Sequence, residues 1–343
     1  MNRISSLDGF RAISIILVVF SHFRFLDDFP EGLAGFAKQF DVGVTVFFVI
    51  SGFLITTLLL KEYEKDNTIS IKEFYIKRAF RILPVFLLYF LLICCLNYFR
   101  NIEITPSNFL HAITFTANFD QNKNWFIGHF WTLSIEEQFY LFWPLTLLFF
   151  KRNIKLVILF LIIYSWFVRV VVYKFHLNPS IFLHPFFSIS DSILIGALTA
   201  VLKQENPKLF TNKIFRYRYL QILALLIIIL FVYSSAYGKL AYVSLPFGNT
   251  IIAICIMYII LSYIYPQNNL IFKFLNHRVM VHIGVLSYSI YIWQEFFFTK
   301  EALLFNKFPL NIIAIYLIST ASYYLWEKPF LNLRKRVLQK QFN

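Results

Sequence analysis

Residues 154–173 read IKLVILFLIIYSWFVRVVVY, and within this stretch only Lys155 and Arg169 carry a formal charge. A helix of roughly 20 mostly apolar residues is about 30 Å long, which matches the hydrocarbon core of a bilayer. The stretch therefore predicts a helix that crosses a membrane.

Runs of the same kind recur along the whole chain of 343 residues. Hydrophobic residues make up 59% of the chain and charged residues 15%, whereas soluble domains carry about 25% charged residues. The sequence predicts an all-α, polytopic transmembrane helix bundle of about ten spans, folded as a single integral membrane domain over residues 1–343. The expected spans are residues 10–27, 41–60, 82–99, 126–150, 154–173, 182–202, 219–236, 244–265, 281–299 and 310–327.

The basic residues predict the orientation of these spans. Ten spans place both termini on one side of the membrane, and if that side is cytoplasmic, 23 of the 32 Lys and Arg residues fall in cytoplasmic segments. This asymmetry follows the positive-inside rule, so we expect both termini to be cytoplasmic. The net charge of +14 then reflects topology, which removes the main support for a nucleic-acid partner.

Polar side chains at membrane depth are costly, and this makes them functional candidates. Asp8, Arg11 and His22 follow a spacing of three and four residues, so they share one stripe of the first expected span. Arg11 and His22 are separated by about 16 Å along the axis, which places the arginine at the cytoplasmic mouth and the histidine near mid-membrane. The structural alternative is an anchoring Asp8–Arg11 pair and a histidine satisfied by a neighbouring helix.

The fourth expected span carries a second polar stripe. His129, Thr132, Glu136 and Tyr140 lie on one face, so Glu136 is expected to point inward with them, while Glu137 points about 100° away. Hydrogen bonding between helices is the structural alternative. Two adjacent carboxylates in so apolar a span favour a functional role.

Smaller polar signals lie on other spans. Arg78 and Arg81 are three residues apart on a helix that enters the membrane, and a guanidinium pair suits a phosphorylated ligand, although positive-inside anchoring also explains it. Asp191 has no obvious partner in the sequence, and a polar run in the ninth span ends at Glu295. No Cys or His spacing predicts a metal site.

Taken in order, these segments resemble the membrane-bound acyltransferase-3 family, whose members acylate sugars of surface polysaccharides, peptidoglycan and related acceptors. Each segment is weak by itself, and the ordered set, which covers nearly the whole chain, is specific. The matching segments are LDGFRA at residues 7–12 with His22, FFVISGFLI at 47–55, RAFR at 78–81, WTLSIEEQFY at 131–140, SYS at 287–289 and EKPF at 327–330.

The resemblance implies a reactive histidine at His22, essential basic residues at Arg11, Arg78 and Arg81, and a contribution from the segment around Glu136. It implies acyl-CoA, commonly acetyl-CoA, as the donor substrate, with no bound cofactor. It also implies a carbohydrate or glycolipid acceptor and a multi-pass location in the bacterial inner membrane.

Further expectations concern the surroundings of this site. Asp8, Glu137 and Asp191 are expected to support it. Family members often carry a histidine where this chain has Gln294, so no role passes to that position. The sequence resembles the stand-alone form of the family, an O-acyltransferase with no hydrolase-like domain after the last span.

Two interpretations of the polar residues remain open. In the first, His22 is a general base on an acceptor hydroxyl or a covalent acyl carrier, and Glu136 orients its imidazole. In the second, the protein is a proton-coupled transporter or permease for an anionic or sugar substrate, with the buried His, Glu and Asp residues as a proton relay. The absence of visible sequence repeats favours the enzyme.

Overall fold

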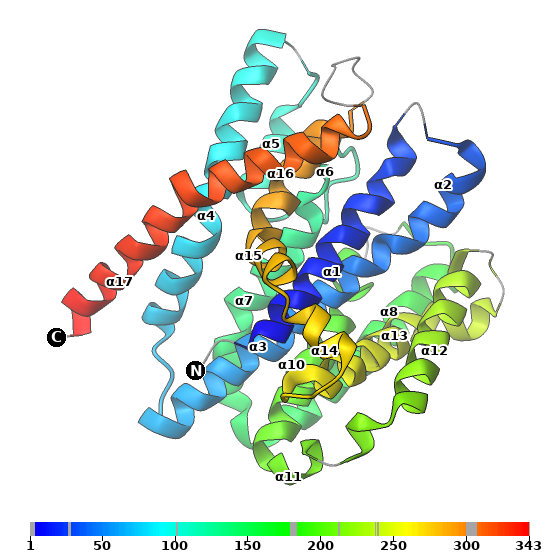
Figure 1. Cartoon of the computed structure of the whole chain (residues 1–343), viewed down its shortest axis with the longest axis vertical. Coiled ribbons are helices and arrows are strands. Elements are labelled where there is room, and N and C mark those ends of the chain that lie inside the picture. The colour runs from blue at the N-terminus through cyan, green and yellow to red at the C-terminus, as the bar shows by residue number, and fades with distance from the viewer. Residues whose placement is uncertain are drawn as a thin grey trace. The chain divides into compact units, whose positions relative to one another are not determined.

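The computed structural model describes residues 4–26, 29–100, 102–178, 184–211, 213–236, 238, 240–299 and 307–342. The described residues form helices and connecting loops without strands, so the all-α prediction is confirmed (Figure 1). The α-helices are α1 (Ser5–His22), α2 (Glu31–Lys38), α3 (Val42–Asp66), α4 (Ile71–Arg100), α5 (Pro106–Ile113), α6 (Trp125–Gly128), α7 (Phe130–Phe150), α8 (Ile154–Lys174), α9 (His184–Phe187), α10 (Ser190–Glu205), α11 (Pro207–Phe210), α12 (Arg218–Ala236), α13 (Ala241–Ile264), α14 (Leu270–Leu275), α15 (Arg278–Trp293), α16 (Leu310–Ser322) and α17 (Lys328–Phe342). Two short elements matter for the site, the 3₁₀-helix η5 (Gln294–Phe297) and the π-helix η7 (Tyr323–Glu327).

Among the described residues, 6 helical segments are long and apolar enough to cross a membrane. One of them, Trp125–Lys174, is 50 residues long and contains both α7 and α8. The expected spans 182–202, 281–299 and 310–327 correspond to the shorter helices α10, α15 and α16, and residues 182–183 lie outside the described part. The protein is thus a multi-pass membrane protein, and the count of ten spans stays a prediction.

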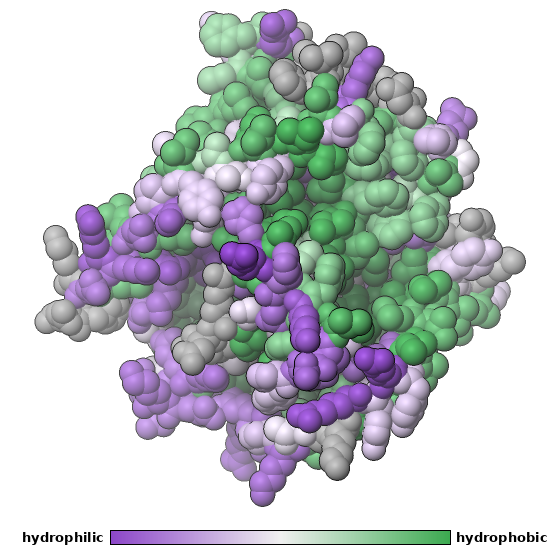
Figure 2. All heavy atoms as spheres, viewed as in Figure 1, coloured by the Kyte–Doolittle hydropathy of each residue, from purple (hydrophilic) through white to green (hydrophobic). Residues whose placement is uncertain are grey.

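The outer faces of these helices agree with a lipid environment. On α12, Ile222, Leu226 and Ile229 are 57%, 57% and 62% exposed. Figure 2 shows hydrophobic side chains over wide areas of the visible face. A contiguous apolar surface of this kind marks contact with a partner or a membrane. In a membrane protein the lipid chains cover it.

The chain divides into two compact units, each built from segments far apart in the sequence. Unit 1 comprises residues 1–21, 35–69 and 135–285, and unit 2 comprises residues 22–34, 70–134 and 286–343. Four boundaries fall inside helices, namely α1, α2, α7 and α15, and one falls just before α4. The expected single membrane domain is not tested by this division.

In unit 1, α3 and α10 pack closely along their lengths. The approach depends on two glycines, because a Cβ atom at Gly52 would overlap the backbone carbonyl of Ile193, and one at Gly196 would overlap that of Val49. Small residues of this kind let membrane helices bring their backbones together. The pair α3–α10 is therefore fixed by main-chain proximity.

In unit 2, α4 is the helix against which the C-terminal segments pack. The π-helix η7 and α17 both contact it, and Figure 1 shows α17 lying across α4. Tyr288 of α15 and Trp326 of η7 donate hydrogen bonds to backbone carbonyls of α4 at or near its internal Pro84. This packing brings distant sequence motifs to one stretch of α4.

Candidate active site

His22 is the last residue of α1 and lies in unit 2, where it is surrounded by aromatic rings. Its ring centroid is 6.0 Å from those of Phe25 and Phe298 and 6.4 Å from that of Trp125. The side chain is 14% exposed, so it is shielded but still reachable. The aromatic rings thus restrict the orientation of the imidazole.

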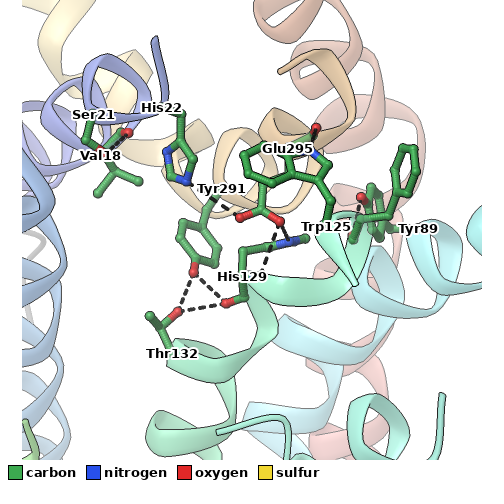
Figure 3. Close-up of polar contacts among 10 residues, drawn as sticks. Val18, Ser21, His22, Tyr89, Trp125, His129, Thr132, Tyr291 and Glu295 are labelled. Carbon is green, nitrogen blue, oxygen red and sulfur yellow. Dashed lines mark hydrogen bonds and ion pairs between the residues drawn. The ribbon is translucent and has the colours of Figure 1, made fainter. Parts of the chain in front are cut away.

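The carboxylate of Glu295 lies between two imidazoles (Figure 3). Glu295 belongs to the 3₁₀-helix η5, which continues α15. Its Oε1 is 3.6 Å from Nε2 of His22. Its Oε2 is 2.8 Å from Nδ1 of His129. The longer distance exceeds that of a normal hydrogen bond but is within reach of an ion pair.

His129 occupies the break between α6 and α7, and its backbone takes part in the site. The first N–H groups of a helix have no partner within that helix, and the N–H of His129 donates to Oε2 of Glu295 at 3.2 Å. A negative charge at a helix N-terminus is also favoured by the helix dipole. Glu295 thus accepts two hydrogen bonds from one residue, which compensates its burial at 6% exposure.

The carbonyl of His129 is held as firmly as its N–H. It accepts a hydrogen bond of 2.7 Å from the hydroxyl of Tyr291 and one of 3.3 Å from that of Thr132, and these two hydroxyls bond to each other. Tyr291 lies on α15, one helical turn before Glu295. The junction of α6 and α7 is therefore tied to α15 at several points (Figure 3).

Trp125 and Tyr89 complete the frame. The indole N–H of Trp125 donates to the backbone carbonyl of Glu295 at 2.9 Å, and the hydroxyl of Tyr89 donates to the carbonyl of Phe126 at 2.7 Å. The Tyr89 ring packs edge-on against His129 and Trp293, with centroid distances of 5.6 and 5.4 Å. Helices α4, α6 and α15 thereby fix the position of the carboxylate.

A lysine in the loop before α6 adds positive charge near Glu295. Burial lowers the pKa of Lys123, while the negative charges of Asp120 and Glu295 act in the opposite direction. Its ammonium nitrogen is 5.8 Å from the ring centroid of Trp131.

The two histidines differ in access to a substrate. The His129 side chain is 1% exposed, against 14% for His22. His129 is therefore the residue that holds Glu295, and His22 is the residue that can meet a reacting group. A carboxylate beside a histidine orients the imidazole and stabilises its protonated form, which suits proton transfer or acyl transfer.

A second polar cluster in unit 2 contains Arg81 and two of the motifs near the C-terminus. The hydroxyl of Tyr288 donates to the carbonyl of Ile82 at 2.9 Å, and the indole of Trp326 donates to that of Pro84 at 2.8 Å. Ser289 bonds to the buried carboxylate of Glu327, on which Arg81 also acts electrostatically. The RAFR, SYS and EKPF segments therefore meet on α4.

Arg78 lies one helical turn before Arg81 on α4, and its guanidinium carbon is 5.9 Å from the ring centroid of Phe74. His22, Arg78 and Arg81 thus belong to unit 2. The other expected site residues belong to unit 1.

In unit 1, Asp8 and Arg11 form an ion pair of 3.9 Å within α1. Glu136 accepts a hydrogen bond of 2.7 Å from Ser51, and Glu137 is half-buried on the same helix, α7. The carboxylate that the structure places beside His22 is Glu295. The role of Glu136 in orienting the imidazole stays a prediction.

Asp191, for which the sequence offers no obvious partner, pairs with Arg169. Both are buried, at 0% and 6% exposure, and one guanidinium nitrogen of Arg169 lies 2.8 Å from Asp191. The same arginine donates to the carbonyls of Ser188 and Pro246, and Thr250 donates to Asp191. This network joins α8, α10 and α13 of unit 1 and accounts for two charges at membrane depth.

Glu295 and Trp125 have no role that the sequence predicts. Glu295 carries the one available signal, since it is a carboxylate that ends a polar run within an expected span. Trp125 offers no signal of its own, because an aromatic residue at the start of a span is also typical of an interface anchor. No described group of His, Cys, Asp and Glu residues has the arrangement of a metal site.

These features define a class, the multi-pass membrane proteins with a buried histidine–carboxylate site. The family described as "Acyltransferase domain" matches residues 4–326, and the chain belongs to this family of membrane acyltransferases. The family expected from the sequence motifs is thereby confirmed.

Several curated relatives carry O-acetyltransferase names. A protein named "Putative O-acetyltransferase" in Staphylococcus aureus strain COL is 30% identical over 319 residues, which cover 86% of this chain and 50% of the relative. The peptidoglycan O-acetyltransferase OatA of Listeria monocytogenes is 33% identical over 168 residues, 44% of this chain and 25% of its own. The "Putative peptidoglycan O-acetyltransferase YrhL" of Bacillus subtilis is 27% identical over 364 residues, 95% of this chain and 54% of its own.

The chain spans about half the length of the staphylococcal and Bacillus relatives that it matches. No solved structure matches the chain.

Proposed function

We propose that this protein transfers an acyl group, most simply acetyl, from acyl-CoA to a hydroxyl of a cell-surface or lipid-linked sugar. The observation that carries the proposal is the carboxylate of Glu295 held between His129 and the more accessible His22. Membership of the acyltransferase family supplies the reaction class.

In the proposed reaction, His22 takes the proton of the acceptor hydroxyl as its oxygen attacks the thioester carbonyl. The tetrahedral intermediate collapses to the new ester and the thiolate of CoA, which takes the proton from the imidazolium. Glu295 stabilises that imidazolium during the transfer, while His129 keeps the carboxylate aligned. General-base catalysis of this kind contributes about 10²- to 10⁴-fold to a rate.

A relayed reaction uses the same residues. A nitrogen of His22 attacks the thioester, and CoA leaves as the thiol with the proton that the imidazole gives up. The acyl-imidazole then passes the acyl group to the acceptor oxygen, and the proton of the acceptor hydroxyl returns to the imidazole. Ping-pong kinetics and a burst of CoA release in the absence of acceptor distinguish this route from direct transfer.

The donor is proposed to enter from the cytoplasmic side of the inner membrane. Arg78 and Arg81 carry guanidinium groups at the expected cytoplasmic end of α4, and such groups bind phosphates through paired hydrogen bonds. Ser289 and Glu295 are six residues apart on one continuous helical segment, a rise of about 9 Å. This segment connects the arginine end of unit 2 with His22.

The acceptor is proposed to be a carbohydrate or glycolipid. Support comes from the relatives in Listeria and Bacillus, whose names refer to peptidoglycan O-acetylation. A transporter also uses buried ionisable groups, but the acyltransferase family match favours the enzyme.

The test is acetyl transfer by purified protein in proteoliposomes, followed with radiolabelled acetyl-CoA and extracted surface glycans. Wild-type protein is expected to label the glycan and H22A to lose at least 10²-fold of the rate. The matched control is H176N, because His176 is exposed and asparagine tolerates its φ of 48°. Undiminished transfer by H22A overturns the proposed mechanism. Mass spectrometry of glycans from a deletion strain identifies the acceptor.

A further inference from the structure

The C-terminal helix α17 is strongly basic. It contains Lys328, Arg334, Lys335, Arg336 and Lys340 and has no acidic residue. It packs against α4, the helix that carries Arg78 and Arg81, and Figure 2 shows hydrophilic side chains gathered at the end where α17 lies in Figure 1.

One face of α17 is half-buried in unit 2. Among the described side chains of this face, Arg334 alone is charged. The half-buried residues recur at helical spacing and are Phe330, Leu331, Arg334, Val337 and Leu338. The neighbouring Lys335 and Arg336 are exposed, as are Asn332 and Leu333 on the preceding turn. Arg334 is thus set apart from the other basic residues by its direction, which the helical register fixes.

Arg334 and Arg81 lie close enough to repel each other. Burial, and after it the positive charge of Arg81, lowers the pKa of Arg334. The guanidinium of Arg334 nevertheless stays charged at neutral pH. Among the described residues, neither one has a carboxylate within ion-pair distance.

The nearby acid does not balance these charges. Glu327 feels the charge of Arg81, but this one carboxylate also accepts a hydrogen bond from Ser289. Arg78, one turn before Arg81, adds a third guanidinium to the same end of unit 2. The like charges of the half-buried Arg81 and Arg334 are unfavourable unless an anion joins them.

We propose that Arg334 joins Arg78 and Arg81 in a cradle of three guanidiniums, which we call the guanidinium cradle, that binds the phosphate groups of the acyl-CoA donor. The inference rests on the proposed function and deepens it, because it assigns the donor a third ligand from the C-terminal helix. Planar guanidiniums match the oxygens of phosphate in pairs, and several of them fit a ligand that bears more than one phosphate. Arg334 touches the donor far from the reacting thioester, so it is a binding residue.

The guanidinium cradle recognises phosphate groups, and the headgroups of membrane lipids also carry phosphate. An anionic lipid headgroup in the inner leaflet is therefore the competing source. Basic segments near a membrane are attracted to such lipids by electrostatics. The exposed Lys335 and Arg336 suit that role, whereas the inward Arg334 suits a ligand held within unit 2.

The experiment measures binding of CoA to the full-length protein in nanodiscs of neutral lipid by isothermal calorimetry. R334Q is expected to raise the Kd for CoA at least about tenfold, as for loss of a hydrogen bond to a charged group. K335Q removes the same charge from the exposed side and is expected to leave the Kd within about twofold. R334K keeps the charge without the paired donors and should fall between R334Q and wild type.

The outcomes separate the inference from the proposed function. Equal CoA affinity in R334Q and wild type overturns the cradle, and so does an effect of R334Q that appears only when the nanodiscs contain phosphatidylglycerol. A wild-type protein that binds neither CoA nor acetyl-CoA overturns the proposed function instead. Melting curves without ligand show whether R334Q folds, and if it does not, R334K decides between the outcomes.

Discussion

At the scale of single residues, the site depends on how the negative charge of Glu295 is shared. Its Oε2 takes both the ring and the backbone N–H of His129, which leaves Oε1 to face His22. Burying a carboxylate is costly unless it is hydrogen-bonded. The two hydrogen bonds from His129 therefore compensate the burial of the carboxylate that faces His22.

Replacement of Glu295 by glutamine tests this arrangement. E295Q preserves the shape of the side chain and removes its charge, so we expect kcat to fall by about 10²-fold or more with little change in the KM for acetyl-CoA. The measurement is steady-state acetyl transfer in proteoliposomes. The control is E205Q, since Glu205 is an exposed carboxylate whose partner is Lys155. A raised KM with normal kcat in E295Q contradicts a positioning role.

The two histidines are expected to fail in different ways. H129A removes a fully buried partner of Glu295, which should lower the free energy of unfolding by about 1–3 kcal/mol and reduce activity as well. H22A removes a more accessible side chain with a longer contact, so its melting temperature should stay near that of wild type while its activity is lost. Thermal unfolding in detergent, paired with activity, reports both. Equal destabilisation by the two substitutions rules out the proposed division of roles.

The sequence could place His22 on the same helix as Arg11, because spacing along a helix is a local property. The reactive role of His22 stays a prediction. Glu295 could not be paired with His22 in advance, because they lie on α1 and η5 and meet only through tertiary packing. The sequence presents several membrane carboxylates of equal standing. Which of them reaches the histidine is decided by helix packing.

At the scale of helices, the structure has a junction between α6 and α7 where the sequence predicts one continuous helix. A continuous helix through residues 126–150 would place His129 on one stripe with Glu136. In the structure α6 ends at Gly128 and α7 begins at Phe130, so the backbone N–H of His129 is available to Glu295. His129 and Thr132 then serve unit 2, while Glu136 bonds to Ser51 in unit 1.

The contact between α3 and α10 gives a prediction at the same scale. G196A is expected to lower the melting temperature of unit 1, because the added methyl group overlaps the carbonyl of Val49 and the two backbones must separate. G32A is the control, since no atom lies within 4 Å of its added Cβ on α2, and alanine there should stabilise the helix by about 0.5–1 kcal/mol. The measurement is thermal unfolding of each variant in one detergent. A stable G196A shows that the helices do not depend on this approach.

At the scale of the whole molecule, composition predicts the class and the distribution of lysine and arginine predicts the orientation. Both properties are sums over many residues, so they tolerate errors in any one span. The number of spans is harder to predict, because α10, α15 and α16 are short when each is taken alone. Length has to be judged over continuous helical segments, and two of these helices are extended by η5 and by η7.

The extended segments predict that α15 and α16 cross the membrane. Arg278–Phe297 is a continuous helical stretch of about 20 residues. Leu310–Glu327 is a stretch of about 18 residues that runs on directly into α17, so both reach the length that a bilayer requires. If both cross, Lys307 lies outside, whereas Asn268 and Asn332 lie in the cytoplasm. Single cysteines at these exposed positions, in a variant without the three native cysteines, can be labelled with an impermeant maleimide in right-side-out vesicles. We expect K307C to react at once and N268C and N332C only after permeabilisation, because a pair of crossings is what separates Lys307 from its two neighbours. Equal protection of all three positions means that neither helix crosses, and the topology of ten spans is then wrong.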